Sequence, residues 1–288
     1  MEWLILVLIS AVFLASRTIL TKKILLKNDT LPLLFFVSLI STVVMIFLYK
    51  SISLDLTLVV YSLILLKSLV IAVAWFCIYQ AYKNLDISTV SPLRNLSPIF
   101  LIVLSLIFLG EKASLINYVR IFILIISAYM LETKSFSNLL EPFKFFKTKY
   151  FLLIIISMIG NSISAILDKI ILKSMNHHSL MFLFYLFLTI IYFIFIASRK
   201  NIKSLKLFSG VKNIILILAI SASALLADFS YFMAVTIPGT LIILIIPLRR
   251  ISTFISTLLG GRLFHEKNLL HKSIICLVMV FAVFLITL

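Results

Sequence analysis

Cysteine, histidine and the common catalytic signatures are scarce or missing in this sequence. The only two cysteines, Cys77 and Cys276, both fall in apolar segments, so they form no disulfide framework and are expected to be buried apolar residues. The four histidines lie in loops or at segment ends without a supporting cysteine or carboxylate cluster, so no metal site is predicted. No GxGxxG, Walker, GxSxG or HExxH motif occurs, so we expect neither a cofactor nor a catalytic residue, and the chain is not expected to be an enzyme.

Long hydrophobic runs dominate what is present. Hydrophobic residues make up 63% of the chain and the mean hydropathy is +1.24, whereas soluble domains are ~45–50% apolar. A run of ~20 apolar residues crosses the hydrocarbon core of a bilayer as a helix. The amino terminus lacks the basic region and cleavage site of a signal peptide, so it is expected to belong to a retained first helix. The sequence therefore predicts an all-α integral membrane protein in the lipid bilayer, with about ten transmembrane helices at approximately 3–21, 31–49, 57–82, 87–109, 115–132, 150–172, 180–197, 212–235, 239–264 and 271–288.

The basic residues gather in the short connections between these segments. A net charge of +16 would suggest nucleic acid as a partner of a soluble protein, but no basic motif of an RNA-binding module occurs, so nucleic acid is not expected. Lysine and arginine are denser after odd-numbered segments than after even-numbered ones. By the positive-inside rule, this bias predicts a multi-pass protein of the plasma membrane with both termini outside.

One motif occurs twice. Pro-Leu-Arg at 92–94 recurs at 247–249, and the same shift of 155 positions carries Glu111 onto Glu266. The longest polar interruption separates the fifth segment from the sixth. We therefore expect a first five-helix repeat over residues 1–132, a basic loop over 133–149 and a second repeat over 150–288. An odd number of helices per repeat inverts the second copy, and inverted repeats enclose a binding site where they meet.

Polar residues at helical spacing mark six of the segments. These stripes predict that segments 3–21, 57–82, 87–109, 150–172, 212–235 and 239–264 surround a central cavity and that the other four face lipid. Small and hydroxyl residues in the stripes also suit ordinary helix packing, and the aromatic ones suit an apolar core. An arginine at membrane depth costs several kcal/mol and normally faces a bundle interior. The predicted substrate-binding residues are Arg17, Trp75, Tyr79, Arg94, Asn95, Asn161, Asp228, Tyr231, Arg249 and Arg250.

Prolines precede the repeated arginines. Pro92 and Pro247 fall at equivalent points of the two halves, and Pro98 adds a second break in the first half only. A proline inside a helix removes a hydrogen bond and kinks the helix. All three are predicted hinge positions beside the binding site.

The two acidic residues at depth have alternative interpretations. Asp228 is the deepest acid, and Trp75 occupies its place in the first half. Asp228 fits a structural ion pair with Arg249 or Arg94, and it equally fits a protonatable site that couples transport to protons, with the arginines binding a substrate carboxylate or phosphate. Asp168 lies near a segment end, so an interfacial, solvated position is expected for it.

The duplicated module over 92–112 and 247–267 resembles the ten-helix EamA-type members of the drug/metabolite transporter superfamily. The similarity covers essentially the whole chain, although His265 stands where Gly110 stands in the first copy. The resemblance implies a basket of ten helices whose two halves rock about a central cavity. It also implies secondary transport, often export of amino acids or other small metabolites. Bacterial relatives usually keep both termini in the cytoplasm, which is opposite to the orientation that the lysines predict.

These observations favour a secondary transporter that exports a small polar or amphipathic metabolite, such as an amino acid, by alternating access. A membrane-embedded enzyme that modifies lipids would need a nucleophile or base beside a metal or acid, and no such cluster is found. A non-transporting assembly partner is the remaining alternative. No feature of the sequence fixes an oligomeric state.

Overall fold

The computed structural model describes residues 2–94, 97–110, 148–198 and 210–266, together with isolated positions at 119–130 and 270–278. Every regular element within these residues is helical. The elements of the first half are α1 (Glu2–Leu25), α2 (Thr30–Ile46), a short 3₁₀ turn (Tyr49–Ser51), α3 (Leu58–Asn84), α4 (Ile87–Leu93) and α5 (Ser97–Leu109). Those of the second half are α8 (Lys149–Ile171), α9 (His177–Ser198), α10 (Val211–Thr236), α11 (Ile242–Arg249), α12 (Ile251–Ile255), a π-helical turn (Ser256–Gly260) and α13 (Gly261–Leu263).

Helices long and apolar enough to cross a membrane occupy most of the segments that the hydropathy pattern predicts. Six such spans are found among the described residues, and one of them is the nearly continuous helical run Ile242–Leu263. Two shorter apolar helices, Thr30–Ile46 and Phe100–Leu109, fall in the predicted second and fourth segments. The predicted segments 115–132 and 271–288 lie largely outside the described residues, so the expected count of ten stays a prediction.

The two segments that carry the repeated arginines are interrupted helices. α4 ends at Leu93 and α11 ends at Arg249, one and two residues after the proline of the repeated motif. Pro98 is the second residue of α5, where a proline costs no helical hydrogen bond. The helix of the predicted segment 87–109 is thus interrupted just before Pro98, and the role of the three prolines as hinges stays a prediction.

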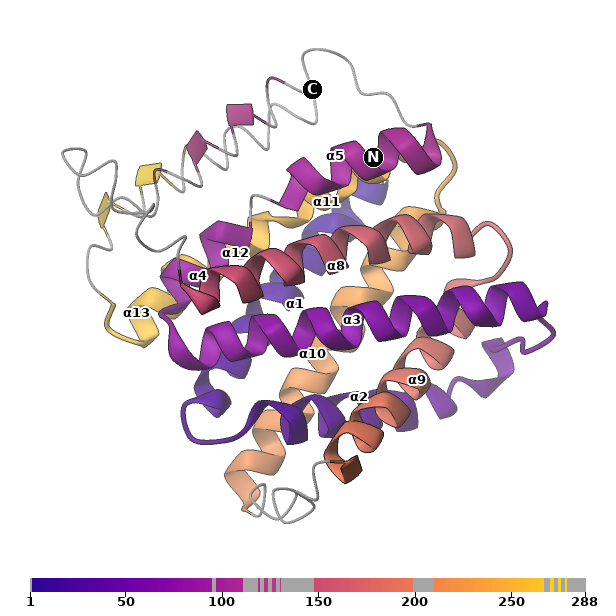
Figure 1. The fold of residues 1–288 in the computed structure, drawn as a ribbon, viewed down its shortest axis with the longest axis horizontal. Coiled ribbons are helices and arrows are strands. Elements are labelled where there is room, and N and C mark those ends of the chain that lie inside the picture. The colour runs from indigo at the N-terminus through magenta and orange to yellow at the C-terminus, as the bar shows by residue number, and fades with distance from the viewer. Residues whose placement is uncertain are drawn as a thin grey trace.

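Helices of the two halves pack against each other symmetrically. When each helix is replaced by its counterpart in the other half, the same set of contacts results. α1 packs along α10 and α3 packs along α8, while α2 packs on α9. In the same way, the contact of α5 with α8 corresponds to the contact of α12 with α1. Figure 1 shows α3 and α8 side by side across the view, with α2 and α9 below them.

Polar contacts at the helix ends show in which direction each helix runs. The ammonium group of Lys22, near the end of α1, donates to the carbonyl oxygens of Tyr82 and Leu85 at 2.7 Å each, where α3 ends. At this same end, the Glu266 carboxylate accepts from the backbone amides of Ile87 and Ser88, where α4 begins, at 3.0 and 3.1 Å. A carboxylate at a helix N-terminus satisfies amides that have no partner within the helix. The end of α13 therefore lies beside the start of α4, as Figure 1 also shows.

A matching contact closes the opposite end of the bundle. The ammonium group of Lys169, near the end of α8, donates to the carbonyl oxygen of Thr240, just before α11 begins, at 2.6 Å. α8 runs antiparallel to α3, because Lys67 pairs with Asp168 while Ala74, further along α3, lies against Gly160. Lysines near the ends of α1 and α8 thus hold equivalent helix junctions at opposite ends.

Gly160 sets the close approach of α8 to α3. A Cβ atom at this position would lie 2.9 Å from the Cβ of Ala74 and 3.4 Å from the carbonyl oxygen of Val70. Small residues let transmembrane backbones approach closely, since packing drives helix association in lipid.

We expect Gly160→Val to lower the melting temperature of the purified protein, because the added methyl groups force α3 and α8 apart, at a cost of about 1–3 kcal/mol. Ile159→Val is the matched control, since Ile159 is 37% exposed on the outer face of α8. Differential scanning fluorimetry in detergent measures both. Equal melting temperatures for Gly160→Val and the wild type would contradict the close approach.

Candidate functional site

A cavity of about 90 Å³ lies where the two halves meet. Its walls come from α1, α3, α8, α9, α10 and α11, with Arg94 and Arg250 at the two helix interruptions. Nine of the ten predicted substrate-binding residues line this cavity, and Asn95 lies outside the described residues. The nine are Arg17, Trp75, Tyr79, Arg94, Asn161, Asp228, Tyr231, Arg249 and Arg250.

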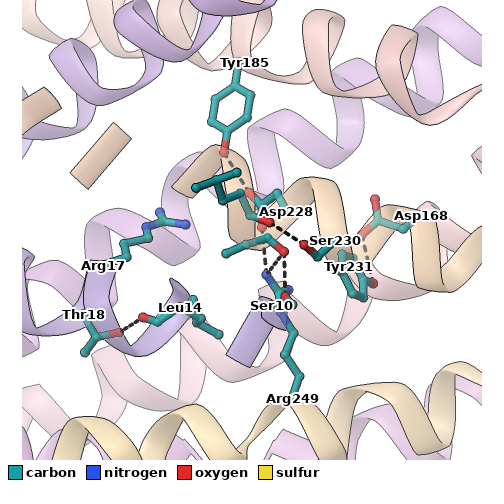
Figure 2. A network of polar contacts seen from close by, with 12 residues as sticks. Ser10, Leu14, Arg17, Thr18, Asp168, Tyr185, Asp228, Ser230, Tyr231 and Arg249 are labelled. Carbon is teal, nitrogen blue, oxygen red and sulfur yellow. Dashed lines mark hydrogen bonds and ion pairs between the residues drawn. The ribbon is translucent and has the colours of Figure 1, made fainter. Parts of the chain in front are cut away.

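Asp228 and Arg249 form an ion pair in the cavity wall. The Nη2 atom of Arg249 lies 2.9 Å from Oδ1 of Asp228, and both side chains are largely buried. Nε of Arg249 donates to the Ser10 hydroxyl at 2.8 Å, and this hydroxyl donates to the Ala227 carbonyl oxygen at 2.6 Å. Figure 2 shows Asp228 between Arg249 on one side and the Tyr185 hydroxyl on the other. Of the two arginines considered as its partner, Arg249 is the one that the structure places on Asp228.

Lys67 and Asp168 form a second ion pair, which joins α3 to α8. Their charged atoms are 3.1 Å apart and the two side chains are 2% and 4% exposed. The expectation of a solvated, interfacial Asp168 was therefore wrong, because the pairing with Lys67 allows this carboxylate to be buried. A buried carboxylate is tolerated when it is paired and hydrogen-bonded.

Tyr231 connects the two ion pairs. Its hydroxyl donates to Oδ2 of Asp168 at 3.3 Å, and the Arg249 guanidinium lies over its ring at 4.4 Å from the centroid. A cation over an aromatic face is attracted to the ring. One network therefore runs from Lys67 on α3 to Asp228 on α10.

Two residues of α9 that were not predicted take part in the site, Phe184 in the cavity wall and Tyr185 as a partner of Asp228. The Tyr185 hydroxyl donates to Oδ2 of Asp228 at 2.8 Å, and the Phe184 ring lies 3.6 Å from the Lys67 ammonium group. The segment 180–197 was expected to face lipid only, so that expectation was wrong for this face of α9. The signal was in the sequence, because Tyr185, Thr189 and Tyr192 recur at the spacing of one helix face, and a buried phenol requires a partner.

Arg17 enters the cavity from α1 between two aromatic side chains. Its guanidinium lies 4.0 Å from the Trp75 ring centroid, and its Nε donates to the Tyr79 hydroxyl at 3.1 Å. Arg17 is 5% exposed. The aromatic stripe of α3 therefore holds a cation at the cavity, besides filling space.

Arg94 and Arg250 are held by hydroxyl groups. Nη1 of Arg94 donates to the Tyr82 hydroxyl at 3.2 Å, and Nη2 of Arg250 donates to the Ser97 hydroxyl at 2.6 Å. Asn161 uses its amide nitrogen on the Ser157 carbonyl oxygen at 2.6 Å, so its amide oxygen is left for another partner at the cavity. No group of three or more potential metal ligands occurs among the described residues.

We expect Lys67→Met to destabilise the protein by about 3–5 kcal/mol, because it leaves the Asp168 carboxylate buried without its counter-ion. Adding Asp168→Asn removes that unpaired charge, so the double variant should recover much of the loss. Melting temperatures of the two singles and the double give the coupling, and Lys212→Met at an exposed position of α10 is the control. Additive effects of the two substitutions would contradict the pairing.

Comparison with known proteins identifies the kind of molecule to which this architecture belongs. The model of the EamA-like transporter family matches residues 1–133. A solved crystal structure aligns with 97% of this chain and 95% of its own, with a TM-score of 0.71 at 14% sequence identity, which shows a shared fold. No curated protein matches the chain significantly. Together with the six apolar helices of spanning length among the described residues, the family match indicates a multi-pass membrane protein whose first half resembles EamA-like transporters.

Proposed function

We propose that the protein is a secondary transporter of the EamA type that exports a small polar or amphipathic metabolite, such as an amino acid, from the cell by alternating access. The observation that carries the proposal is the charged cavity at the contact of the two halves. Ionisable side chains are expensive at membrane depth and mark substrate or ion pathways. Here five cationic and two acidic side chains converge on one space.

The packing of the helices supports two inverted five-helix repeats as the basis of this mechanism. The contacts between α1, α3, α8 and α10 map onto each other when the halves are exchanged. Corresponding helices run in opposite directions, as the end contacts of Lys22 and Lys169 indicate. Inverted repeats rock about a site between them and expose it to one side of the membrane at a time.

The same architecture supports an orientation. Lys22, Lys83 and Arg262 lie at the end of the bundle where α1, α3 and α13 finish. The positive-inside rule assigns this end to the cytoplasm, which leaves the amino terminus outside the plasma membrane. Protons are a candidate coupling ion, with Asp228 as the group that would carry them.

The repeat makes a specific prediction about Glu111. This residue lies outside the described residues, and it precedes Glu266 by the 155 positions that also separate Ile87 from Ile242. If the two halves are inverted copies, each contact between them should have an equivalent with the halves exchanged. The contact of Glu266 with Ile87 then predicts a contact of Glu111 with Ile242. In a cysteine-free background, the pairs Glu266→Cys with Ile87→Cys and Glu111→Cys with Ile242→Cys should both cross-link with a short bifunctional thiol reagent.

The mismatched pair, Glu111→Cys with Ile87→Cys, is the control and should not react within one molecule. Intact-mass spectrometry of the purified protein reads out each pair. A cross-link between 266 and 87 without one between 111 and 242 would reject the inverted duplication.

Transport itself is tested in proteoliposomes. Protein-dependent flux of a mixture of labelled small metabolites, with and without a pH gradient, should appear without any second protein. Arg249→Ala should reduce this flux by about tenfold or more, because it removes a charge-assisted hydrogen-bond donor from the cavity. Arg262→Ala replaces an exposed arginine of the same helical run and should leave the flux unchanged. Unchanged flux in correctly inserted Arg249→Ala would exclude Arg249 as a binding residue, and absence of flux from the wild type would reject the transporter.

A further inference from the structure

The cavity carries an excess of positive charge. Its two carboxylates are both engaged in ion pairs, one with Lys67 and the other with Arg249. The remaining cations of the wall are Arg17, Arg94 and Arg250, and none has a carboxylate partner within the part of the chain that the structure describes. Three guanidinium groups therefore face this space without a counter-ion.

The sequence repeat shows where the excess comes from. Arg94 and Arg249 occupy equivalent positions, but the place of Asp228 is taken in the first half by Trp75. The first half therefore contains Arg94, the counterpart of Arg249, but has no acidic residue at the position that corresponds to Asp228. The second half adds Arg250, whose counterpart in the first half is the uncharged Asn95.

Arg250 is the one of the three that has a buried donor without a hydrogen-bond partner among the described residues. It is 9% exposed, its Nη2 atom binds the Ser97 hydroxyl, and its Nε atom is buried without a hydrogen-bond partner among the described residues. Arg94 and Arg249 line the same cavity as Arg250, so like charges gather around it. A buried charge without a counter-ion is destabilising, and an anion placed between these groups would offset that cost.

We infer that, given the proposed transport function, the substrate is an anion whose carboxylate or phosphate group is bound by Arg94 and Arg250. A guanidinium group presents its N–H donors in a planar fork that matches either oxyanion. The carbon skeleton of the substrate lies against the apolar wall formed by Ile71, Ile78 and Ile246.

The acidic residues argue against an organic cation as the substrate. The two oxygens of Asp228 accept from Arg249 and Tyr185, and those of Asp168 face Lys67 and Tyr231. An ammonium group would have to displace one of these partners and would also meet three unneutralised arginines. The cavity therefore disfavours an organic cation.

Ligands that differ chiefly in charge test the inference directly. The purified full-length protein in nanodiscs is titrated with two sets of ligands, each with an anion, an amide and an amine. The sets are phenylacetate, phenylacetamide and phenethylamine, and butyrate, butyramide and butylamine. Phenyl phosphate and inorganic phosphate test whether a phosphate group binds instead of a carboxylate. Isothermal titration calorimetry should show the anion of a set binding about tenfold or more tighter than its amide, since charge-assisted hydrogen bonds distinguish them. The ammonium member should bind weakest.

Variants then assign the residues. Arg250→Gln and Arg94→Gln should each weaken anion binding by about tenfold and leave amide binding unchanged, while Arg262→Gln should change neither. The wild-type series decides the charge class even where a variant fails to fold. Equal affinity for anion and amide, preference for the amine, or no binding of any carboxylate or phosphate would overturn the inference. Anion-selective binding without flux in proteoliposomes would support an anion site and reject the transport function. Flux restricted to neutral or cationic metabolites would support transport and reject the anion site.

Discussion

The need to neutralise charge away from water governs the centre of this molecule. A carboxylate or guanidinium group inside a membrane-spanning bundle is tolerated only when partners replace the water that it has lost. Lys67 and Asp168 meet this requirement across the contact of α3 with α8, and so does Arg249 through Asp228 and Ser10. Because these partners come from both halves, the interactions that stabilise the buried charges also hold the two halves together around the cavity.

Close helix packing follows from this arrangement. The charged atoms of Lys67 and Asp168 meet at 3.1 Å, in a region where α3 and α8 are brought together by the missing side chain of Gly160. Aromatic residues supply the remaining contacts, because Tyr231 and Tyr185 each donate a hydroxyl to one of the two carboxylates. The helices, the ion pairs and the tyrosines therefore depend on one another. A change in either ion pair affects the other, because Tyr231 contacts both Asp168 and Arg249.

Much of this architecture could be predicted from the sequence, because bilayer thickness and helical periodicity act locally. Apolar runs of spanning length located α1, α3, α8, α9 and α10, and the spacing of polar residues brought Arg17, Trp75 and Arg249 to one cavity. The pairing of charges was less accessible, since the partner of Asp168 is a lysine about one hundred positions earlier in the chain. Its sequence neighbour Lys169 suggested a helix end in water, and that local signal was misleading.

The prediction that α9 faces lipid failed because most of its side chains are apolar. Tyr185, Thr189 and Tyr192 recur on one face of this helix, and the hydroxyls of the two tyrosines bind Asp228 and the Ala72 carbonyl oxygen. Three polar residues among many apolar ones are a weak signal in the sequence. Their three-dimensional neighbours show that this face is buried.

One contact couples the last continuous stretch of the chain that the structure describes to the fourth helical segment. Where α4 begins, both oxygens of the Glu266 carboxylate accept from two adjacent backbone amides, which fixes direction as well as distance. Glu266 lies just after the helical run Ile242–Leu263. Any rocking of the halves would therefore carry the start of α4 and the end of that run together as one piece.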